Sequence, residues 1–356
     1  MIVDIVKVFL PAVLSFVIGM IITPFLSNYL YKHELWKKKS VTVAVDGSEA
    51  PISQKLHNDE AKKTPRMGGI IIWASTALSI LLLWGISQVF GTDLFAKLGF
   101  LSRNQTWIPL FTLVFGGFVG LVDDYLETKG GGDYKAGGLS LTKRLAIVIL
   151  IGLLAGSWFY FKLGVSHLGL PAGHSIPLGV FFIPFFAIVM VALYSSGVID
   201  GLDGLSGGIF AIIFTAYAGI AFYQQQINLA AFCLAIVGGI LAFLWFNIPP
   251  ARFYMSETGT MALTITLAIV AFITDYLGSG YGVLVLPVIA FPLVITVASN
   301  IIQVVSKKFR GKKVFLVAPI HHHFQALGWP SYKVVMRYWV IGIIFALLGV
   351  VLALVG

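Results

Sequence analysis

Long apolar runs alternate with short polar stretches along almost the whole chain. An α-helix needs about 20 apolar residues to cross the hydrocarbon core of a bilayer. The pattern therefore predicts an all-α integral membrane protein with ten transmembrane helices, and we expect one domain over 1–356. The predicted spans are 8–30, 68–90, 107–122, 144–163, 176–198, 206–224, 229–246, 259–277, 281–305 and 335–355. Pro184, Pro287 and Pro292 interrupt apolar runs, and we expect kinks there.

The composition supports a membrane protein. Hydrophobic residues make up 58% of the chain and charged residues only 11%, whereas soluble domains carry about 25% charged residues. The single cysteine, Cys233, lies in an apolar run. A single cysteine excludes an intramolecular disulfide and a thiolate metal cluster. We expect Cys233 to serve helix packing. The run 8–30 is too long for the apolar part of a signal peptide, so we expect a retained helix.

The basic residues sort to one side of the predicted membrane. Most of the 24 lysines and arginines fall in the alternate loops 31–67, 123–144, 247–258 and 306–337. Because cytoplasmic loops carry an excess of such residues, we expect these loops in the cytoplasm and both termini outside. The net charge of +9 then reflects topology and not a nucleic acid partner.

Four polar stretches, 121–144, 199–208, 246–260 and 318–328, all fall on this cytoplasmic side. They carry carboxylates, imidazoles and glycines from segments far apart along the chain. Their common side predicts one site at the cytoplasmic headgroup level. The outer loop 166–179 has the Gly and Pro spacing of a short hairpin.

The acidic residues of these stretches allow two interpretations each. Asp123 and Asp124 could be solvated acids at a helix end, although adjacent like charges at a helix C-terminus are disfavoured unless a cation neutralises them. Asp200 and Asp203 could cap the helix that follows. The glycines around them would also let a ligand approach the backbone. Glu257 could be an ordinary acid in a first helical turn.

His321, His322 and His323 are consecutive, and consecutive residues rarely chelate one metal, which disfavours a zinc site. They could touch anionic lipid as part of a basic loop, or donate hydrogen bonds to a diphosphate. Carboxylates, cationic donors and an open backbone together fit a hard divalent cation and a phosphate-rich substrate. Mg²⁺ favours one or two carboxylates with phosphate oxygens and water, and phosphoryl transfer needs charge neutralisation and alignment above all.

These motifs resemble those of the polyprenyl-phosphate N-acetylhexosamine-1-phosphate transferases, and within them the phospho-N-acetylmuramoyl-pentapeptide transferase family. The resemblance covers nearly the whole chain, and the triple histidine favours the muramoyl branch. The motifs are "TPRMGG" (64–69), "VDDY" (122–125), "GLS" followed by Lys143, "DGLDGL" (200–205), "WFN" (245–247), "ETG" (257–259) and "APIHHHF" (318–324).

The resemblance implies roles at the matching positions. Asp123 and Asp124 would handle the lipid phosphate, one of them as its base. Glu257 stands where the family binds Mg²⁺ through an Asp, and Asp123 and Asp124 are further candidate metal ligands. The catalytic set also includes the histidines near the diphosphate and nucleoside, His321, His322 and His323. The expected substrate contacts are Asp200, Asp203, Asn247, Lys143, Lys129, Tyr254 and Thr64.

Several positions depart from the family pattern. Gly197 replaces an Asn, Glu257 replaces an Asp, and Glu127 replaces a Lys. The motif "TPRMGG" carries Arg66 where the muramoyl branch has Thr, and the preceding "HNDEAKK" lacks a Lys of that branch.

The implied reaction transfers phospho-MurNAc-pentapeptide from UDP-MurNAc-pentapeptide to undecaprenyl phosphate, giving lipid I and UMP for peptidoglycan synthesis. We expect Mg²⁺ as cofactor, direct attack by the lipid phosphate, and a cytoplasmic active site in the bacterial inner (cytoplasmic) membrane. Membrane lipid is a partner, nucleic acid is not, and a homodimer is left open.

The alternative in the same superfamily transfers GlcNAc-1-phosphate from UDP-GlcNAc to a polyprenyl phosphate. A membrane transporter would need charges at the bilayer midplane, whereas Asp275 and Asp4 fall near the outer ends of their helices. A CDP-alcohol phosphotransferase would carry D-G-x-x-A-R, which "DGLDGL" does not match.

Overall fold

The computed structural model describes residues 2–36, 63–89, 98–102, 105–130, 138–170, 174–277 and 281–355, and this part of the chain is mainly helical. Its α-helices are α1 (Ile2–Lys32), α3 (Ile70–Val89), α5 (Trp107–Lys129), α6 (Leu141–Leu163), α7 (Phe182–Ser195), α8 (Leu205–Tyr223), α9 (Ile227–Asn247), α10 (Ser256–Leu277), α11 (Leu286–Ile289), α12 (Phe291–Arg310), α13 (Ile320–Ala326) and α14 (Ser331–Val355). Short 3₁₀-helices, η3 (Gly179–Phe181) and η4 (Ser196–Ile199), flank α7.

Nine helices of the described residues are long and apolar enough to cross a membrane. They match nine of the ten predicted spans, and they confirm an all-α integral membrane protein. The hairpin predicted in the loop 166–179 is present as two antiparallel strands, β1 (His167–Gly169) and β2 (Ser175–Pro177), with Leu168 opposite Ile176. Cys233 is buried in α9 without a disulfide, as expected for a packing residue.

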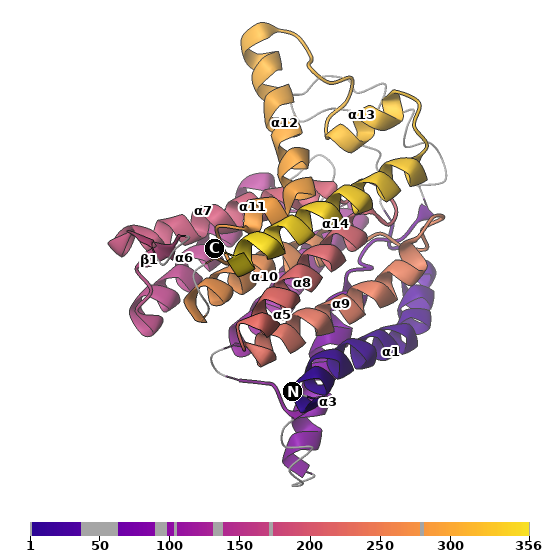
Figure 1. Ribbon diagram of the computed structural model, residues 1–356. Helices are drawn as coiled ribbons and strands as arrows, with labels where there is room; N and C mark the ends of the chain where they lie inside the picture. Colours follow the sequence, from indigo (N-terminus) through magenta and orange to yellow (C-terminus); the bar gives the residue numbers. More distant parts are fainter. Residues whose placement is uncertain are drawn as a thin grey trace.

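The predicted span 281–305, with its expected kinks, is not a single helix. The segment forms the four-residue α11, passes through Ala290, and starts again as α12. Pro287 and Pro292 each stand in the first turn of one of these helices, where a residue without an N–H is tolerated best. The expected kinks are therefore a break, and α12 projects away from the bundle (Figure 1). Pro184 lies in the first turn of α7, directly after η3.

Helix α12 buries polar residues and exposes apolar ones. Thr296, Ser299 and Gln303 are buried, while Ile301 and Val305 are exposed. A helix that turns apolar residues outward is suited to contact with lipid, where no water has to be displaced.

Helix α10 lies at the centre of the bundle. Every residue from Thr258 to Thr274 is buried, and α5, α7 and α8 pack around it. A helix that is apolar on all sides is typical of such a position. Because other helices enclose α10, the position of its first residue, Ser256, is fixed within the bundle.

Glycines bring α5 very close to α10. Gly116 and Gly120 are four residues apart and so lie on one helix face. A Cβ at Gly116 would lie 3.2 Å from the Ala262 Cα, and one at Gly120 would overlap the Glu257 carbonyl oxygen. Small residues at this spacing let membrane helices approach each other closely. The next position on the face is Asp124, which is therefore delivered to the start of α10.

A methyl group at Gly120 should push α5 away from α10. We expect Gly120→Ala to lower the free energy of unfolding by about 1–3 kcal/mol, the usual cost of overpacking. The control Gly219→Ala, on an exposed side of α8 where an added Cβ meets nothing within 4 Å, should be neutral or stabilise by up to about 1 kcal/mol. Thermal unfolding in detergent measures both, and equal unfolding temperatures would contradict the close packing.

Candidate active site

Two carboxylates from other segments bind the N-terminus of α10. The Ser256 N–H donates to Asp200 Oδ2 at 2.8 Å, and the Thr258 N–H donates to Asp124 Oδ2 at 2.9 Å. The Thr258 hydroxyl donates to the same oxygen at 2.6 Å. The first N–H groups of a helix have no partner within it and carry partial positive charge, so carboxylates are favourable there. Asp200 also holds Ser256 at a φ of 56°, a conformation that costs about 1–3 kcal/mol and persists only where the surroundings enforce it.

Arg144, in the first turn of α6, joins two further carboxylates. Its Nη1 donates to Glu257 Oε1 at 2.5 Å and lies 3.6 Å from Asp123 Oδ2. The other oxygen of Asp123 accepts the Leu139 N–H at 2.6 Å. Asp123 is 3% exposed and Asp124 is fully buried, so the interpretation of the pair as solvated acids at a helix end is wrong.

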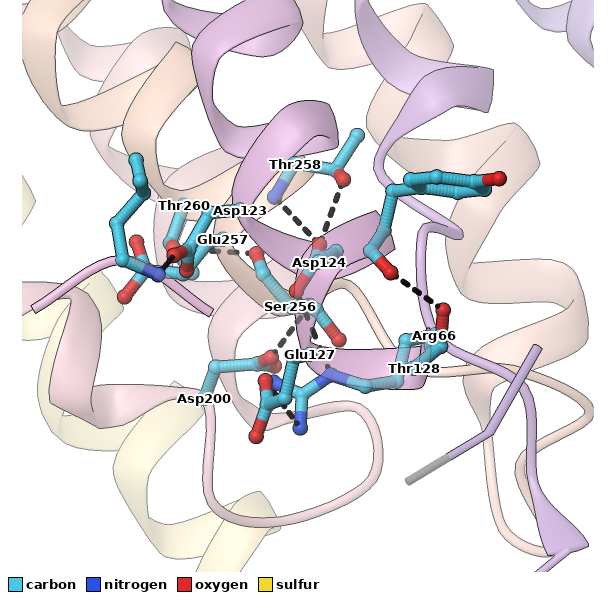
Figure 2. A network of polar contacts seen from close by, with 12 residues as sticks. Arg66, Asp123, Asp124, Glu127, Thr128, Asp200, Ser256, Glu257, Thr258 and Thr260 are labelled. Carbon is cyan, nitrogen blue, oxygen red and sulfur yellow. Dashed lines mark hydrogen bonds and ion pairs between the residues drawn. The ribbon is translucent and has the colours of Figure 1, made fainter. Parts of the chain in front are cut away.

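Arg66 supplies the second cation of the cluster. Its Nε lies 3.4 Å from Asp124 Oδ1, and its Nη1 lies 3.2 Å from Glu127 Oε2. Figure 2 shows Asp124 between Thr258 on one side and Arg66 on the other. Burial alone would lower the pKa of the guanidinium, but Asp124 and the other nearby carboxylates raise that pKa, so Arg66 keeps its charge.

Asp200 and Asp203 do not cap α8, so the interpretation of these two aspartates as caps of the following helix is wrong. The N-cap of α8 is Gly204, at a φ of 78°, without a hydrogen bond from a capping side chain. Asp200 Oδ1 accepts the Ser206 hydroxyl at 2.6 Å, and Asp203 Oδ2 accepts the Ala251 N–H at 3.1 Å. Burial raises the pKa of both aspartates, and these hydrogen bonds oppose the rise.

Asn247 connects two loops of the site. Its Oδ1 accepts the Gly204 N–H at 2.8 Å, and its Nδ2 donates to the Phe253 carbonyl at 2.9 Å. The amide is buried, so the structure gives it a clear positioning role at the turn that follows Asp203. Its direct contact with substrate stays a prediction.

The histidine run divides into two parts. A Cβ at Gly201 would lie against Nε2 of both His321 and His322, so both buried rings lie beside the turn that carries Asp200. His323 is placed differently, because its Nδ1 accepts the Leu316 N–H at 3.2 Å. Consecutive residues of a helix point about 100° apart, so the three imidazoles of α13 do not share one direction.

Of the remaining predicted contacts, the two lysines lie farther out. Lys129 is exposed at the end of α5 with its Nζ 5.7 Å from the centre of the Tyr125 ring, and Lys143 is exposed in the first turn of α6. Burial raises the pKa of Tyr254, and a hydrogen bond with the Thr64 side chain opposes that rise. Thr64 precedes Arg66 by two residues, and the Tyr254 backbone is hydrogen-bonded to Pro65 and Gly68 on either side of Arg66.

Three known proteins that are similar to this chain share one name. A model of glycosyl transferase family 4 matches residues 106–275. The phospho-N-acetylmuramoyl-pentapeptide-transferase of Anoxybacillus flavithermus is 31% identical over 345 residues, 95% of each chain. The protein of that name from a Geobacillus species is 33% identical over 96% of each chain. The one from Rickettsia massiliae is also 33% identical, over 94% of this chain and 88% of the relative.

The chain belongs to the phospho-N-acetylmuramoyl-pentapeptide-transferase family. Two of its departures from the family motifs are neighbours in space, since Arg66 and Glu127 form an ion pair. An acid at position 127 is thus accompanied by a base at position 66. Gly197, another departure, lies in η4, where a Cβ would make a tight contact of 3.3 Å with the Thr260 side chain.

Sequence reasoning missed Arg66 and Arg144 as site residues. Arg144 counted only as part of a basic loop, and Arg66 only as a departure from a motif. A usable signal was the surplus of acids, because buried carboxylates require partner cations. Five acidic side chains in one predicted cluster call for arginines or lysines close to them in space.

The carboxylates fit a magnesium ion that is shared with substrate. In the described part of the chain, no three His, Cys, Asp or Glu side chains are arranged to hold a metal by themselves. Arg66 and Arg144 stand between the acids. Asp124 Oδ1, however, is buried without a hydrogen-bond partner and offers a hard oxygen ligand. Mg²⁺ needs only one or two carboxylates when phosphates and water complete its shell, so Asp124, Asp123 and Glu257 are suitable ligands.

The Arg144–Glu257 pair should behave as a compensated charge pair. Arg144→Met alone leaves buried carboxylates without their cation, and we expect it to lower the free energy of unfolding by about 3 kcal/mol. Adding Glu257→Gln to that variant should recover about 1 kcal/mol or more. Denaturant or thermal unfolding of the two single variants and the double variant measures this coupling. Additive losses would show that the two side chains do not interact.

Proposed function

We propose that this protein transfers phospho-MurNAc-pentapeptide from UDP-MurNAc-pentapeptide to undecaprenyl phosphate, producing lipid I and UMP. The observation that carries the proposal is the convergence of Asp123, Asp124, Asp200 and Glu257 with two arginines at one helix end. The names of relatives that match nearly the whole chain supply the substrates. Those names do not favour the GlcNAc-1-phosphate alternative.

The reaction is a displacement at phosphorus. An oxygen of the lipid phosphate attacks the phosphorus that bears the sugar, the bond to the bridging oxygen breaks, and UMP leaves. Asp123 or Asp124 takes the proton of the acceptor phosphate or orients it. Mg²⁺, held by Glu257, Asp123 and Asp124, would neutralise the diphosphate charge as the bond breaks.

The nucleotide would lie along the other wall of the site. His321 and His322 flank the turn at Gly201, where imidazole N–H groups can donate to diphosphate oxygens. Asp200 and Asp203 fix that turn against the segment that leads into α10. We place UMP here because hydrogen-bond acceptors for a base and ribose adjoin donors for the phosphates.

We further propose that the site faces the cytoplasm and that both termini lie outside, in the inner membrane. Arg66, Arg144 and the basic last turn of α12, with Lys307, Lys308 and Arg310, support this orientation by the excess of basic residues on cytoplasmic faces. The broken segment α11–α12 would then serve as the tenth crossing. Mg²⁺ dependence and a homodimer belong to the same proposal and rest on the family.

Removing a carboxylate of the cluster should stop the reaction. We expect Asp124→Asn and Glu257→Ala to reduce the rate of UMP release by about 10²-fold or more, the usual contribution of an acid–base group. Purified protein in detergent is given Mg²⁺, undecaprenyl phosphate and either UDP-MurNAc-pentapeptide or UDP-GlcNAc. Glu34→Gln, at an exposed position, should behave as wild type. Wild-type turnover in both site variants, or UMP release from UDP-GlcNAc alone, would refute the proposal.

Metal removal gives an independent test. Chelation with EDTA should abolish UMP release, and added Mg²⁺ should restore it. Mg²⁺ should also raise the unfolding temperature of the wild type, because a ligand that binds only the folded state stabilises it. Glu257→Ala should lose most of that rise. Full activity in EDTA would exclude the metal from the reaction.

A further inference from the structure

Arg66 has hydrogen-bonding capacity that its protein partners do not use. Its Nε is buried without a hydrogen-bond partner, and so is the Asp124 Oδ1 that faces it at 3.4 Å. The two groups attract each other as charges without forming an aligned hydrogen bond. A guanidinium offers five N–H donors in a rigid plane, so Arg66 is able to bind a second acceptor.

Glu127, the other acid paired with Arg66, lies nearer the surface than Asp124. Glu127 follows Asp124 by three residues and so lies on the same face of α5. Its side chain is 11% exposed, that of Arg66 is 22% exposed, and that of Asp124 is fully buried. Figure 2 shows the guanidinium next to both acids. Glu127 therefore holds the outer edge of the guanidinium, where an incoming group would arrive.

The backbone around Arg66 is fixed. Its own N–H donates to the Leu35 carbonyl at 2.9 Å, the Tyr254 N–H donates to Pro65 at 2.9 Å, and the Gly68 N–H donates to Tyr254 at 2.8 Å. These bonds tie the segment to the end of α1 and to the chain before α10. A change of partner at Arg66 thus requires movement of the side chain alone.

We propose that Arg66 binds a substrate phosphate and that Glu127 is its resting partner, which Arg66 leaves when the phosphate enters. A guanidinium matches phosphate oxygens in a two-point geometry that an ammonium cannot reproduce. The phosphate belongs either to the lipid acceptor, a monoester, or to the nucleotide donor, a diphosphate. This inference rests on the proposed function and adds a specific residue to it.

The two partners should give opposite effects. Arg66→Lys keeps the charge but loses the planar donors, and we expect it to raise the KM of one phosphate substrate about tenfold. Glu127→Gln removes the competing acid, and it should lower the same KM about two- to fivefold. In the double variant the gain from Glu127→Gln should disappear. KM is measured for undecaprenyl phosphate and for UDP-MurNAc-pentapeptide separately, each with the other saturating, which identifies the source of the phosphate.

Controls and a binding measurement complete the test. Arg252→Lys and Glu34→Gln change the same residue types at exposed positions and should leave both KM values as in wild type. Calorimetry with inorganic pyrophosphate and Mg²⁺ needs no turnover, and binding should weaken in Arg66→Lys and tighten in Glu127→Gln. If the pair is only structural, both variants lower the unfolding temperature and neither tightens binding or lowers a KM, which overturns the inference.

The binding arm separates this inference from the proposed function. Wild-type protein that releases no UMP from UDP-MurNAc-pentapeptide would refute the proposed function. Opposite shifts in pyrophosphate binding would still support a phosphate site at Arg66. Equal pyrophosphate binding by the wild type and both variants would refute the inference even in a fully active enzyme.

Discussion

The structure depends on how charge is balanced at the buried end of α10. The first N–H groups of that helix have no partners within it, and in this protein Asp124 and Asp200 provide them. These carboxylates in turn need cations, which Arg66 and its counterpart Arg144 supply to the cluster. The capping of α10 therefore depends on the ion pairs, and both depend on the positions of α5, α6 and the turn before α8. Removal of one member leaves an unbalanced buried charge.

Such a cluster is expensive to bury, and apolar side chains would often stabilise a fold as well or better. Local rules are broken in the same place, since Ser256 has a positive φ and Arg66 Nε lacks an aligned partner. Strain and unsatisfied polar groups of this kind concentrate where a protein binds or transforms a ligand. Under the proposed function, the phosphates of the substrates and Mg²⁺ are the ligands that would use these groups.

Much of the architecture could be predicted from the sequence, because a membrane span leaves a long apolar run. The polar stretches also indicated which acids would meet, as Asp124, Asp200 and Glu257 do. The ion pairs could not be predicted, because the sequence shows that Arg144 is basic but not which acids it contacts. The break between α11 and α12 was missed because Pro292 marks a perturbation without telling a kink from an interruption. The divergence of His323 depends on the axis of α13, which the motif does not contain.

A structure of the protein with UDP-MurNAc-pentapeptide and Mg²⁺ bound tests this account most directly. The account predicts that the diphosphate lies at the start of α10, within contact of Arg66 and the two buried histidines, and that Glu257 and Asp124 hold the metal. A diphosphate bound elsewhere, with the Arg66–Asp124 and Arg144–Glu257 pairs unchanged, would contradict it.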